Sequence, residues 1–401
     1  MDIEHLGQVF TPAEIVGQML ALRRNFGRVL EPSCGAGAFY KVIWDCVAIE
    51  LDPLVCPPGA NCTDFFDYPT EEKFDTIIGN PPYVRYQDIA PATKKIIESK
   101  SANFNVSAVD FDRRSNLYLF FIAKCIEHLT PHGELIFITP REFLKATSAR
   151  KLNEFIYDSG TITDLIDLAD QRVFDGATPD CIIFRFEKGN FTRKTAVATG
   201  TLRQADRRLN ELRIGKFSTK FFSISNGQLL FTSDEYQAKF SDLFYVKVGG
   251  VSGMDSVFAS DEFGTHDFVC SETRQTGATR RMIYNSKCNY LEQHKSELLA
   301  RRIRHFDESN WWMWGRNCYV SSAPRIYVNM KTRVENPFFL HSCNYFDGSI
   351  LGIFPHDISA DLNKLCEKLN SIDWAELGFR AGGRFLFSQR ALENTKIMII
   401  D

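Results

Sequence analysis

The sequence has no C-x-x-C pair and no hydrophobic run long enough to cross a membrane. Its eleven cysteines are odd in number and scattered, so we predict neither a disulfide framework nor a metal site. No stretch of about 18 apolar residues occurs, and the first residues lack the basic and apolar segments of a secretion signal. We therefore expect a cytoplasmic protein with no membrane partner.

Two phosphate-binding motifs are also absent. The sequence contains neither G-x-G-x-x-G nor G-x-x-x-x-G-K-[ST], so it favours neither a dinucleotide nor a nucleoside triphosphate as ligand. No separate region combines paired acids with a lysine as a nuclease would. We therefore do not expect this chain to cleave nucleic acid.

The formal net charge of −3 is small but unevenly distributed. Residues 1–190 hold 19 basic and 27 acidic residues, and residues 191–401 hold 28 and 23, so the halves carry about −8 and +5. A basic second half is consistent with contact to a polyanion and equally with an ordinary solvated surface. Charge alone leaves both interpretations open.

A chain of 401 residues, 44% of them hydrophobic, is long enough for two cores. In its first half, short apolar runs alternate with helical patterns, which predicts a doubly wound α/β domain with a mainly parallel sheet. We place this domain over residues 1–190, a polar linker over 191–214, and a second, mixed α/β domain over 215–401. The predicted strands are 28–32, 47–51, 74–79, 134–139, 161–167 and 180–186, and the predicted helices are 116–128 and 148–157.

A glycine-containing turn follows the first predicted strand. Its glycines let the backbone approach a ligand, and its N–H groups point at that ligand where the turn opens a helix. Such a turn also occurs where a helix merely packs on a strand. The segment is Glu31-Pro32-Ser33-Cys34-Gly35-Ala36-Gly37.

Two acids follow at the ends of the next strands. Glu50, followed by Leu51, ends the second strand, where a carboxylate can accept both hydroxyls of a ribose. Asp64 and Phe65 come after a third short strand, where an acid and an aromatic ring could hold an adenine. Singly, each acid would be an ordinary capping or surface residue. Their order and spacing together predict a nucleoside site.

The tetrad Asn80-Pro81-Pro82-Tyr83 directly follows the strand that ends at Gly79. Two prolines fix the backbone and remove two N–H donors, which leaves carbonyl oxygens as acceptors beside the Asn80 carboxamide. An amine conjugated to a ring is a poor nucleophile because its lone pair is delocalised. The Asn80 side-chain oxygen and the Pro81 carbonyl could hold both amine hydrogens, and Tyr83 could stack on the ring. A plain strand-ending turn would not explain the whole tetrad.

In their order and in their residues, these motifs resemble those of the gamma-class N6-adenine DNA methyltransferases of bacterial modification systems. The resemblance is close over residues 7–187 and looser beyond. The resemblance implies a class I fold that binds S-adenosylmethionine (AdoMet), followed by a target-recognition domain. It further implies methyl transfer to the N6 amine of an adenine flipped out of double-stranded DNA, without a metal.

The resemblance also assigns individual residues. The segment from Gly7 to Glu14 would close over the cofactor, and Phe174 would pack against the flipped base. The residues of that segment also predict a helix start with Thr11 as N-cap. Asn80, Pro81, Pro82, Tyr83 and Phe174 are then the catalytic residues. The implied cofactor-binding residues are Thr11, Glu31, Pro32, Ser33, Cys34, Gly35, Gly37, Glu50, Leu51, Asp64, Phe65, Asn80 and Phe121.

DNA contacts are expected in the second domain. Arginines there would anchor phosphates, and a few polar side chains would read base edges. Each arginine taken singly is equally explained as a solvated surface charge. The candidates are Arg280, Arg281, Arg301, Arg302, Arg380, Arg384 and Arg390.

Other acceptors remain open. N4-cytosine in DNA, an exocyclic amine of ribosomal RNA and a protein glutamine pose the same lone-pair problem, and a non-catalytic subunit of a larger restriction complex is a further alternative. We expect a monomeric bacterial or phage enzyme associated with DNA. It would act alone or beside a separately encoded restriction endonuclease.

Overall fold

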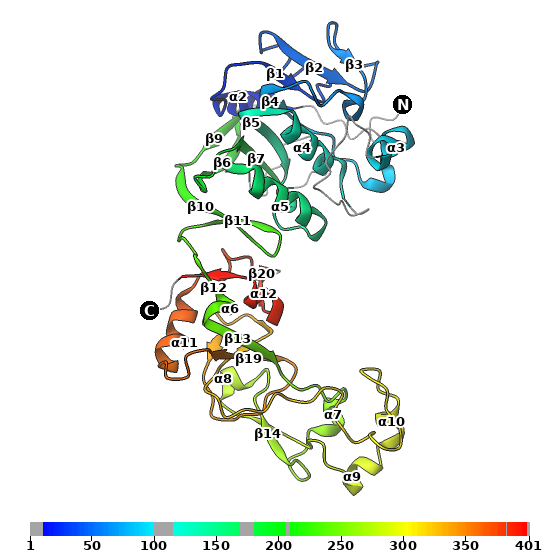
Figure 1. Cartoon of the computed structure of the whole chain (residues 1–401), viewed down its shortest axis with the longest axis vertical. Coiled ribbons are helices and arrows are strands. Elements are labelled where there is room, and N and C mark those ends of the chain that lie inside the picture. The colour runs from blue at the N-terminus through cyan, green and yellow to red at the C-terminus, as the bar shows by residue number, and fades with distance from the viewer. Residues whose placement is uncertain (1–10, 100–114, 169–179, 206–208, 382, 399–401) are drawn as a thin grey trace. The chain divides into compact units, whose positions relative to one another are not determined.

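The computed structural model describes residues 11–99, 115–168, 180–205, 209–381 and 383–398 (Figure 1). The chain divides into two compact units, unit 1 up to Asp234 and unit 2 from Glu235 onward. None of the helices in these ranges is long and apolar enough to cross a membrane.

Eleven strands among the described residues of unit 1 form one sheet (Figure 1). Its first half has the order β3-β2-β1-β4-β5 and is parallel, and the antiparallel β7 lies between β5 and β6. The strand order reverses between β1 and β4, and ligands of open α/β sheets bind outside the carboxyl ends of the strands at such a point. The strands are β1 (Val29–Glu31), β2 (Cys46–Glu50), β3 (Asn61–Cys62), β4 (Phe74–Gly79), β5 (Leu129–Pro140), β6 (Gly160–Asp167) and β7 (Cys181–Lys188).

Helices cover both faces of this sheet. In β5, Leu135 and Phe137 pack in one core with α4 (Leu117–His128) and α5 (Arg150–Ser159). Ile136 and Ile138 pack in a second core with α2 (Ala13–Ala21) on the other face. Successive side chains of a strand point to opposite faces, so a strand buried on both sides is apolar throughout. The predicted doubly wound, mainly parallel α/β fold is confirmed.

The sheet continues beyond residue 190, where the sequence suggested a linker. In β8, Lys194 and Thr199 are exposed while Thr195 and Ala198 are buried, so its polar composition reflects one solvated face. The structure therefore corrects the linker over 191–214, and it divides the chain after residue 234 rather than at 190 and 215. The added strands are β8 (Lys194–Ala205), β9 (Leu209–Ile214), β10 (Ser218–Ser225) and β11 (Gln228–Thr232).

Two local expectations also differ from the structure. Residues 35–42 form a run of turns rather than a helix, and two N–H groups of this run find an acceptor in the Glu31 carboxylate. Helix α2 begins at Ala13 with Pro12 as N-cap, without a side-chain capping bond. The Thr11 hydroxyl accepts a hydrogen bond from Asn80 instead of capping the helix.

Unit 2 is mixed α/β, as predicted. Its main sheet is antiparallel, in the order β13 (Phe244–Val248), β19 (Ile350–Pro355), β16 (Ile326–Asn329), β18 (Phe338–Phe339). Trp311, Trp314 and Tyr327 are fully buried in its core, so the aromatic clusters without helical or strand periodicity are core residues. Smaller sheets join β12 (Ala238–Lys239) to β22 (Lys396–Ile397), β14 (His266–Phe268) to β15 (Arg280–Met282), and β17 (Lys331–Thr332) and β20 (Arg380–Ala381) to β21 (Arg384–Leu386).

The helices of unit 2 are short, apart from α11, and most connect its strands. They are α6 (Phe240–Leu243), α7 (Asp255–Phe258), α8 (Thr273–Thr276), α9 (Asn289–Glu292), α10 (Lys295–Leu299), α11 (Leu362–Ser371) and α12 (Gln389–Glu393).

Candidate functional site

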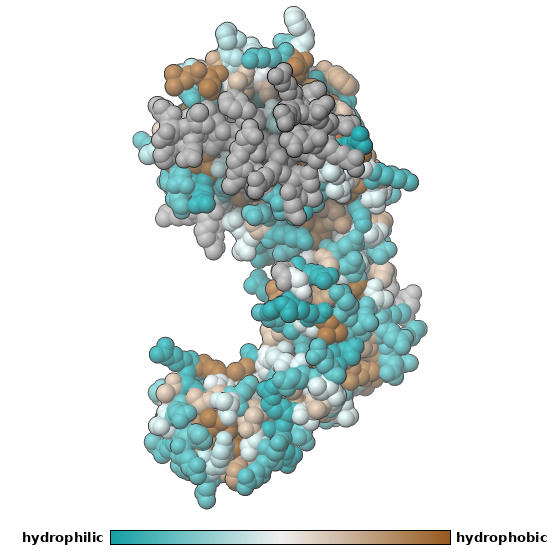
Figure 2. Space-filling model, turned by 180° about the vertical axis from the view of Figure 1, so that it is seen from behind, coloured by the Kyte–Doolittle hydropathy of each residue, from teal (hydrophilic) through white to brown (hydrophobic). Residues whose placement is uncertain are grey.

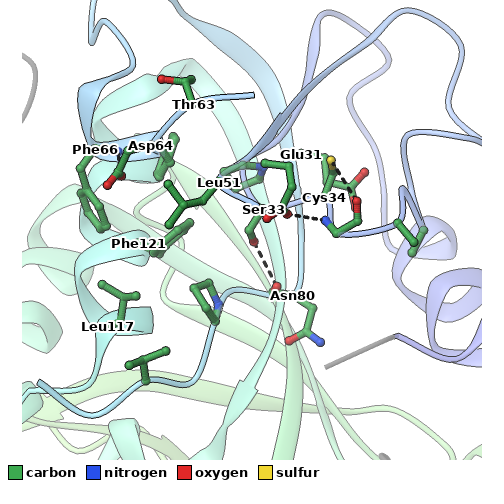
Figure 3. Close-up of a pocket in the computed structure, with 18 of the residues that line it drawn as sticks. Glu31, Ser33, Cys34, Leu51, Thr63, Asp64, Phe66, Asn80, Leu117 and Phe121 are labelled. Carbon is green, nitrogen blue, oxygen red and sulfur yellow. Dashed lines mark hydrogen bonds between the residues drawn. The ribbon is translucent and has the colours of Figure 1, made fainter. Parts of the chain in front are cut away.

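A cavity of about 590 Å³ lies at the carboxyl ends of β1, β2 and β4 (Figure 3). Its volume falls within the range of about 300–1,000 Å³ that is usual for small-ligand sites. The structure brings all thirteen residues of the predicted cofactor set into its wall: Thr11, Glu31, Pro32, Ser33, Cys34, Gly35, Gly37, Glu50, Leu51, Asp64, Phe65, Asn80 and Phe121.

The turn after β1 forms one side of the cavity. Gly35 and Gly37 have φ angles of +52° and +85°, which side chains with a Cβ rarely adopt. The Cys34 N–H donates to the Ile49 carbonyl of β2 at 2.9 Å, so the turn is fixed to the neighbouring strand. Glycine at these two positions therefore shapes the backbone that faces the cavity.

Glu31 is buried at the end of β1. Its carboxylate accepts hydrogen bonds from the N–H groups of Tyr40, at 2.6 Å, and Phe39, at 3.4 Å. Burial raises the pKa of Glu31 to about 8, and the two backbone donors oppose that rise. A cation bound in the cavity would favour the ionised form.

Glu50 connects the end of β2 to the glycine turn. Its Oε2 accepts from the Gly35 N–H at 2.7 Å, and its Oε1 accepts from the Asp52 N–H at 2.8 Å. Each carboxylate oxygen has a second lone pair, so Glu50 could also accept hydrogen bonds from ribose hydroxyls. Glu50 thus shapes the turn in addition to lining the cavity.

Aromatic rings form the wall opposite the glycine turn. The ring of Phe121, on α4, lies 5.0 Å from Phe65 and 5.1 Å from Phe66 between centroids. Both phenylalanines belong to the 3-10 turn η1 (Phe65–Asp67), which Asp64 caps by accepting from the Phe66 N–H at 2.9 Å. The other Asp64 oxygen accepts from the Thr93 hydroxyl at 2.5 Å. This wall is suited to a planar, apolar ring that carries a polar edge.

The Asn80–Tyr83 tetrad lies directly beside the glycine turn. The Ser33 hydroxyl donates to the Asn80 backbone carbonyl at 3.1 Å, which Figure 3 shows as a dashed line. The Asn80 Nδ2 donates to the Thr11 hydroxyl at 3.3 Å, and this orientation turns the carboxamide oxygen, an acceptor, away from Thr11. Asn80 and Pro82 both line the cavity.

Tyr83 is held by contacts at both its hydroxyl and its ring. Its hydroxyl donates to the Ile138 carbonyl of β5 at 3.0 Å, and its ring packs edge-on against Tyr118 with 5.8 Å between centroids. Neither Tyr83 nor the buried Pro81 lines the cavity. Phe174, the fifth predicted catalytic residue, lies outside the described residues.

The predicted DNA-binding arginines are not alike. Arg281, Arg302, Arg380 and Arg390 are exposed, and Arg380 pairs with Glu335 at 3.4 Å. Arg280 and Arg281 pair with Glu272 and Asp267, at 3.3 and 3.4 Å. Arg384 is half-buried.

The prediction that Arg301 contacts DNA is wrong. Its side chain is buried, and its guanidinium donates to four backbone carbonyls, those of Ser252, Leu298, Trp311 and Met313. With its donors committed inside the core, it cannot reach DNA. It is a structural residue that ties together three segments of unit 2.

Sequence reasoning missed one part of the cavity wall. The segment after the tetrad contributes residues from the 3-10 turn η2 (Tyr86–Asp88) to α3 (Pro91–Ser99). No motif marks this segment, although its position directly after the tetrad was a usable signal. This segment contributes Val84, Asp88, Ile89, Ala90 and Thr93. The predicted cofactor set also leaves out the lining residues Ala36, Ala38, Lys41, Val42, Thr63, Phe66 and Leu117.

Residues 59–174 match the family model described as the Eco57I restriction-modification methylase. The type II methyltransferase M.HincII of Haemophilus influenzae is 31% identical over 192 residues, which cover 46% of this chain and 38% of that protein. M.TthHB8I of Thermus thermophilus is 30% identical over 197 residues, which cover 46% of this chain and 45% of that protein. The match thus spans less than half of either relative.

A solved structure of the type IIG restriction endonuclease BpuSI covers 99% of this chain and 59% of that one, with 12% identity and a TM-score of 0.45. The domain match and the two type II relatives each cover less than half of this chain, and over that part the chain is similar to restriction-modification methylases.

Proposed function

We propose that this chain transfers the methyl group of AdoMet to the N6 amine of an adenine flipped out of double-stranded DNA, either beside a restriction endonuclease or as a solitary modification enzyme. The observation that carries the proposal is the Asn80–Tyr83 tetrad, whose carboxamide lies in the wall of a cavity with nucleoside-binding features.

The cavity has groups that suit the adenine, the ribose and the positive charge of AdoMet. Phe65, Phe66 and Phe121 offer apolar faces to an adenine ring, and the Glu50 carboxylate offers acceptors to a ribose. Glu31 adds a carboxyl group that favours a cation when ionised. When bound, the cofactor supplies an activated methyl on a sulfonium, so positioning supplies most of the catalysis and no metal is required.

The tetrad would prepare the acceptor amine. The Asn80 oxygen and the Pro81 carbonyl accept its two hydrogens and favour a more tetrahedral nitrogen. The lone pair then points at the electrophilic carbon. Because Thr11 and Ser33 hold the Asn80 side chain and backbone from either side, these acceptors are fixed before the base arrives.

Base flipping fits the location of these groups. An amine inside a stacked duplex cannot reach a tetrad beside a cavity, and extruding the base costs a few kcal/mol. Stacking against an aromatic side chain returns about 1–3 kcal/mol per base, and phosphate contacts add to this. Tyr83 and Phe174 are the stacking residues in this proposal.

Unit 2 would recognise the target sequence. On the face drawn in Figure 2, its surface is largely hydrophilic, with hydrophobic residues in small groups. The exposed residues Arg281, Arg302, Arg380 and Arg390 are the best placed to contact phosphates, with Arg280 and Arg384 as further candidates. We propose a monomer in the cytoplasm, with duplex DNA as its partner.

Incubation with methyl-labelled AdoMet tests the acceptor class. The purified chain would be offered unmethylated genomic DNA, ribosomal RNA and cell protein in parallel. We expect label in duplex DNA alone. Label in RNA or protein, with none in DNA, would assign the tetrad to another amine.

A pH dependence of cofactor binding follows from Glu31. Its raised pKa keeps it protonated below about pH 8, and its ionised form favours the sulfonium, so binding should release a proton. We expect the affinity for AdoMet to rise several-fold from about pH 6 to 8 and then to level off. The free energy of unfolding of the protein without AdoMet should fall as the pH rises from about 4.5 to 8, because the protonated Glu31 favours the folded state.

Calorimetry in buffers of different ionisation enthalpy measures this proton release. Glu31→Gln should show a flat profile, and S-adenosylhomocysteine, which lacks the sulfonium charge, should show a weaker rise. A wild-type profile identical to that of Glu31→Gln would refute the role of Glu31.

A further inference from the structure

Helix α4 buries a lysine among apolar residues. The Lys124 side chain has no exposed surface, and its Nζ donates to the Phe66 and Tyr68 carbonyls, each at 2.8 Å. The same ammonium lies 5.1 Å from the centroid of the Phe65 ring. Lys124 itself does not line the cavity.

Burying this lysine is costly, because desolvation penalises its charge and lowers its pKa to about 8. An apolar side chain would match the rest of the buried face of α4. The carbonyls of Phe66 and Tyr68, however, point into the protein toward α4, and buried carbonyls require donors. The Lys124 ammonium supplies a donor to both carbonyls, which explains why a lysine is buried at this position.

The turn that carries these two carbonyls is part of the cavity wall. Phe65 and Phe66 project from it into the lining, and Asp64 caps it by accepting from the Phe66 N–H. Phe121 precedes Lys124 by three residues, so both lie on the same side of α4, one turn apart. Helix α4 thus contributes one ring of the aromatic wall and the group that fixes the other two rings.

We propose that Lys124 is a positioning residue for the cofactor, which holds the Asp64–Tyr68 turn so that its rings form the adenine end of the cavity. This inference rests on the proposed function of the cavity as an AdoMet site. It assigns the lysine a role in affinity for the adenosyl group, with little role in the methyl-transfer step.

The chain offers a matched control in Lys188. Its Nζ also donates to two backbone carbonyls, those of Ile126 and Leu129, at 2.9 and 3.0 Å, and burial also lowers its pKa. It contacts the far end of α4 and does not line the cavity. Lys124→Met and Lys188→Met therefore both remove a lysine that satisfies two carbonyls, and only the first removes it from the turn that forms the cavity wall.

The test compares the AdoMet dissociation constant, by calorimetry without DNA, with the rate of DNA methylation at saturating AdoMet. For Lys124→Met we expect at least a tenfold weaker Kd and a saturated rate within about threefold of wild type. Lys188→Met should bind AdoMet within twofold of wild type even if its Tm falls. A tenfold change in Kd corresponds to about 1.4 kcal/mol.

Lys124→Arg provides a second variant should Lys124→Met fail to fold. It keeps the charge but forces a larger group into a fully buried place, so the turn must move. We expect about three- to tenfold weaker binding with a nearly normal saturated rate.

Two results would overturn the proposal. If the Lys124 variants bind AdoMet as tightly as Lys188→Met, or if their saturated rate falls as far as their affinity, the lysine is only a structural residue. If the wild-type chain itself binds no AdoMet, the cavity is not an adenosyl site, and the proposed function fails together with the positioning role.

Discussion

Replacing Asn80 with alanine is expected to lower DNA methylation on the order of 10²–10³-fold, the loss typical of removing one preorganised polar group from a reaction centre. The carboxamide oxygen is one of two acceptors for the amine hydrogens, and alanine offers none. AdoMet should still bind, because the glycine turn, Glu50 and the aromatic wall remain. The measurements are single-turnover methylation of DNA and, separately, the AdoMet dissociation constant.

Thr11→Val is a milder variant that perturbs the orientation of the same Asn80 carboxamide. It removes the hydroxyl that receives the Asn80 amide hydrogen at 3.3 Å but leaves the carboxamide in place. We expect a smaller loss of rate, on the order of tenfold, because the acceptor is less well oriented. If Asn80→Ala keeps more than about a tenth of the wild-type rate, the amine is not prepared by the tetrad.

Arg301→Met is expected to have the largest effect on stability. Four backbone carbonyls in the core of unit 2 would lose their donor, and each unsatisfied group costs about 1–3 kcal/mol. We expect the free energy of unfolding of unit 2 to fall by at least about 3 kcal/mol. Tryptophan fluorescence during denaturation follows this unit, because four of the five tryptophans lie in it.

The neighbouring Arg302 is the matched control. It is exposed, so Arg302→Met should change the unfolding free energy by no more than about 0.5 kcal/mol. Arg302→Met should instead weaken DNA binding moderately, and the loss of affinity should depend on the salt concentration. Equal unfolding curves for the two variants would show that the buried hydrogen bonds of Arg301 contribute nothing to stability.

This arginine pair shows where sequence reasoning ends. Two adjacent arginines predict a basic surface, yet one is buried and the other exposed, and only the tertiary position of four carbonyls distinguishes them. The same limit applies to Lys124, because nothing local reveals that Phe66 and Tyr68 direct their carbonyls at α4. Contacts between distant segments leave no mark in a single sequence.

Other features could be predicted because they depend on local physics. The buried strands are continuous apolar runs, and the predicted strand at Phe74–Gly79 coincides with β4. The glycine turn, Glu50 and the tetrad follow successive parallel strands, so they had to meet at one edge of the sheet. Strand β8 was read as a linker because one face of it is solvated, which hides its pairing with β6.

Identification of the methylated base tests the central claim most directly. DNA treated with the wild-type chain and AdoMet would be digested to nucleosides and analysed by mass spectrometry, with Asn80→Ala treated in parallel. We expect N6-methyladenine from the wild type and a loss on the order of 10²–10³-fold in the variant. N4-methylcytosine in its place, or equal N6-methyladenine from both proteins, would contradict the account.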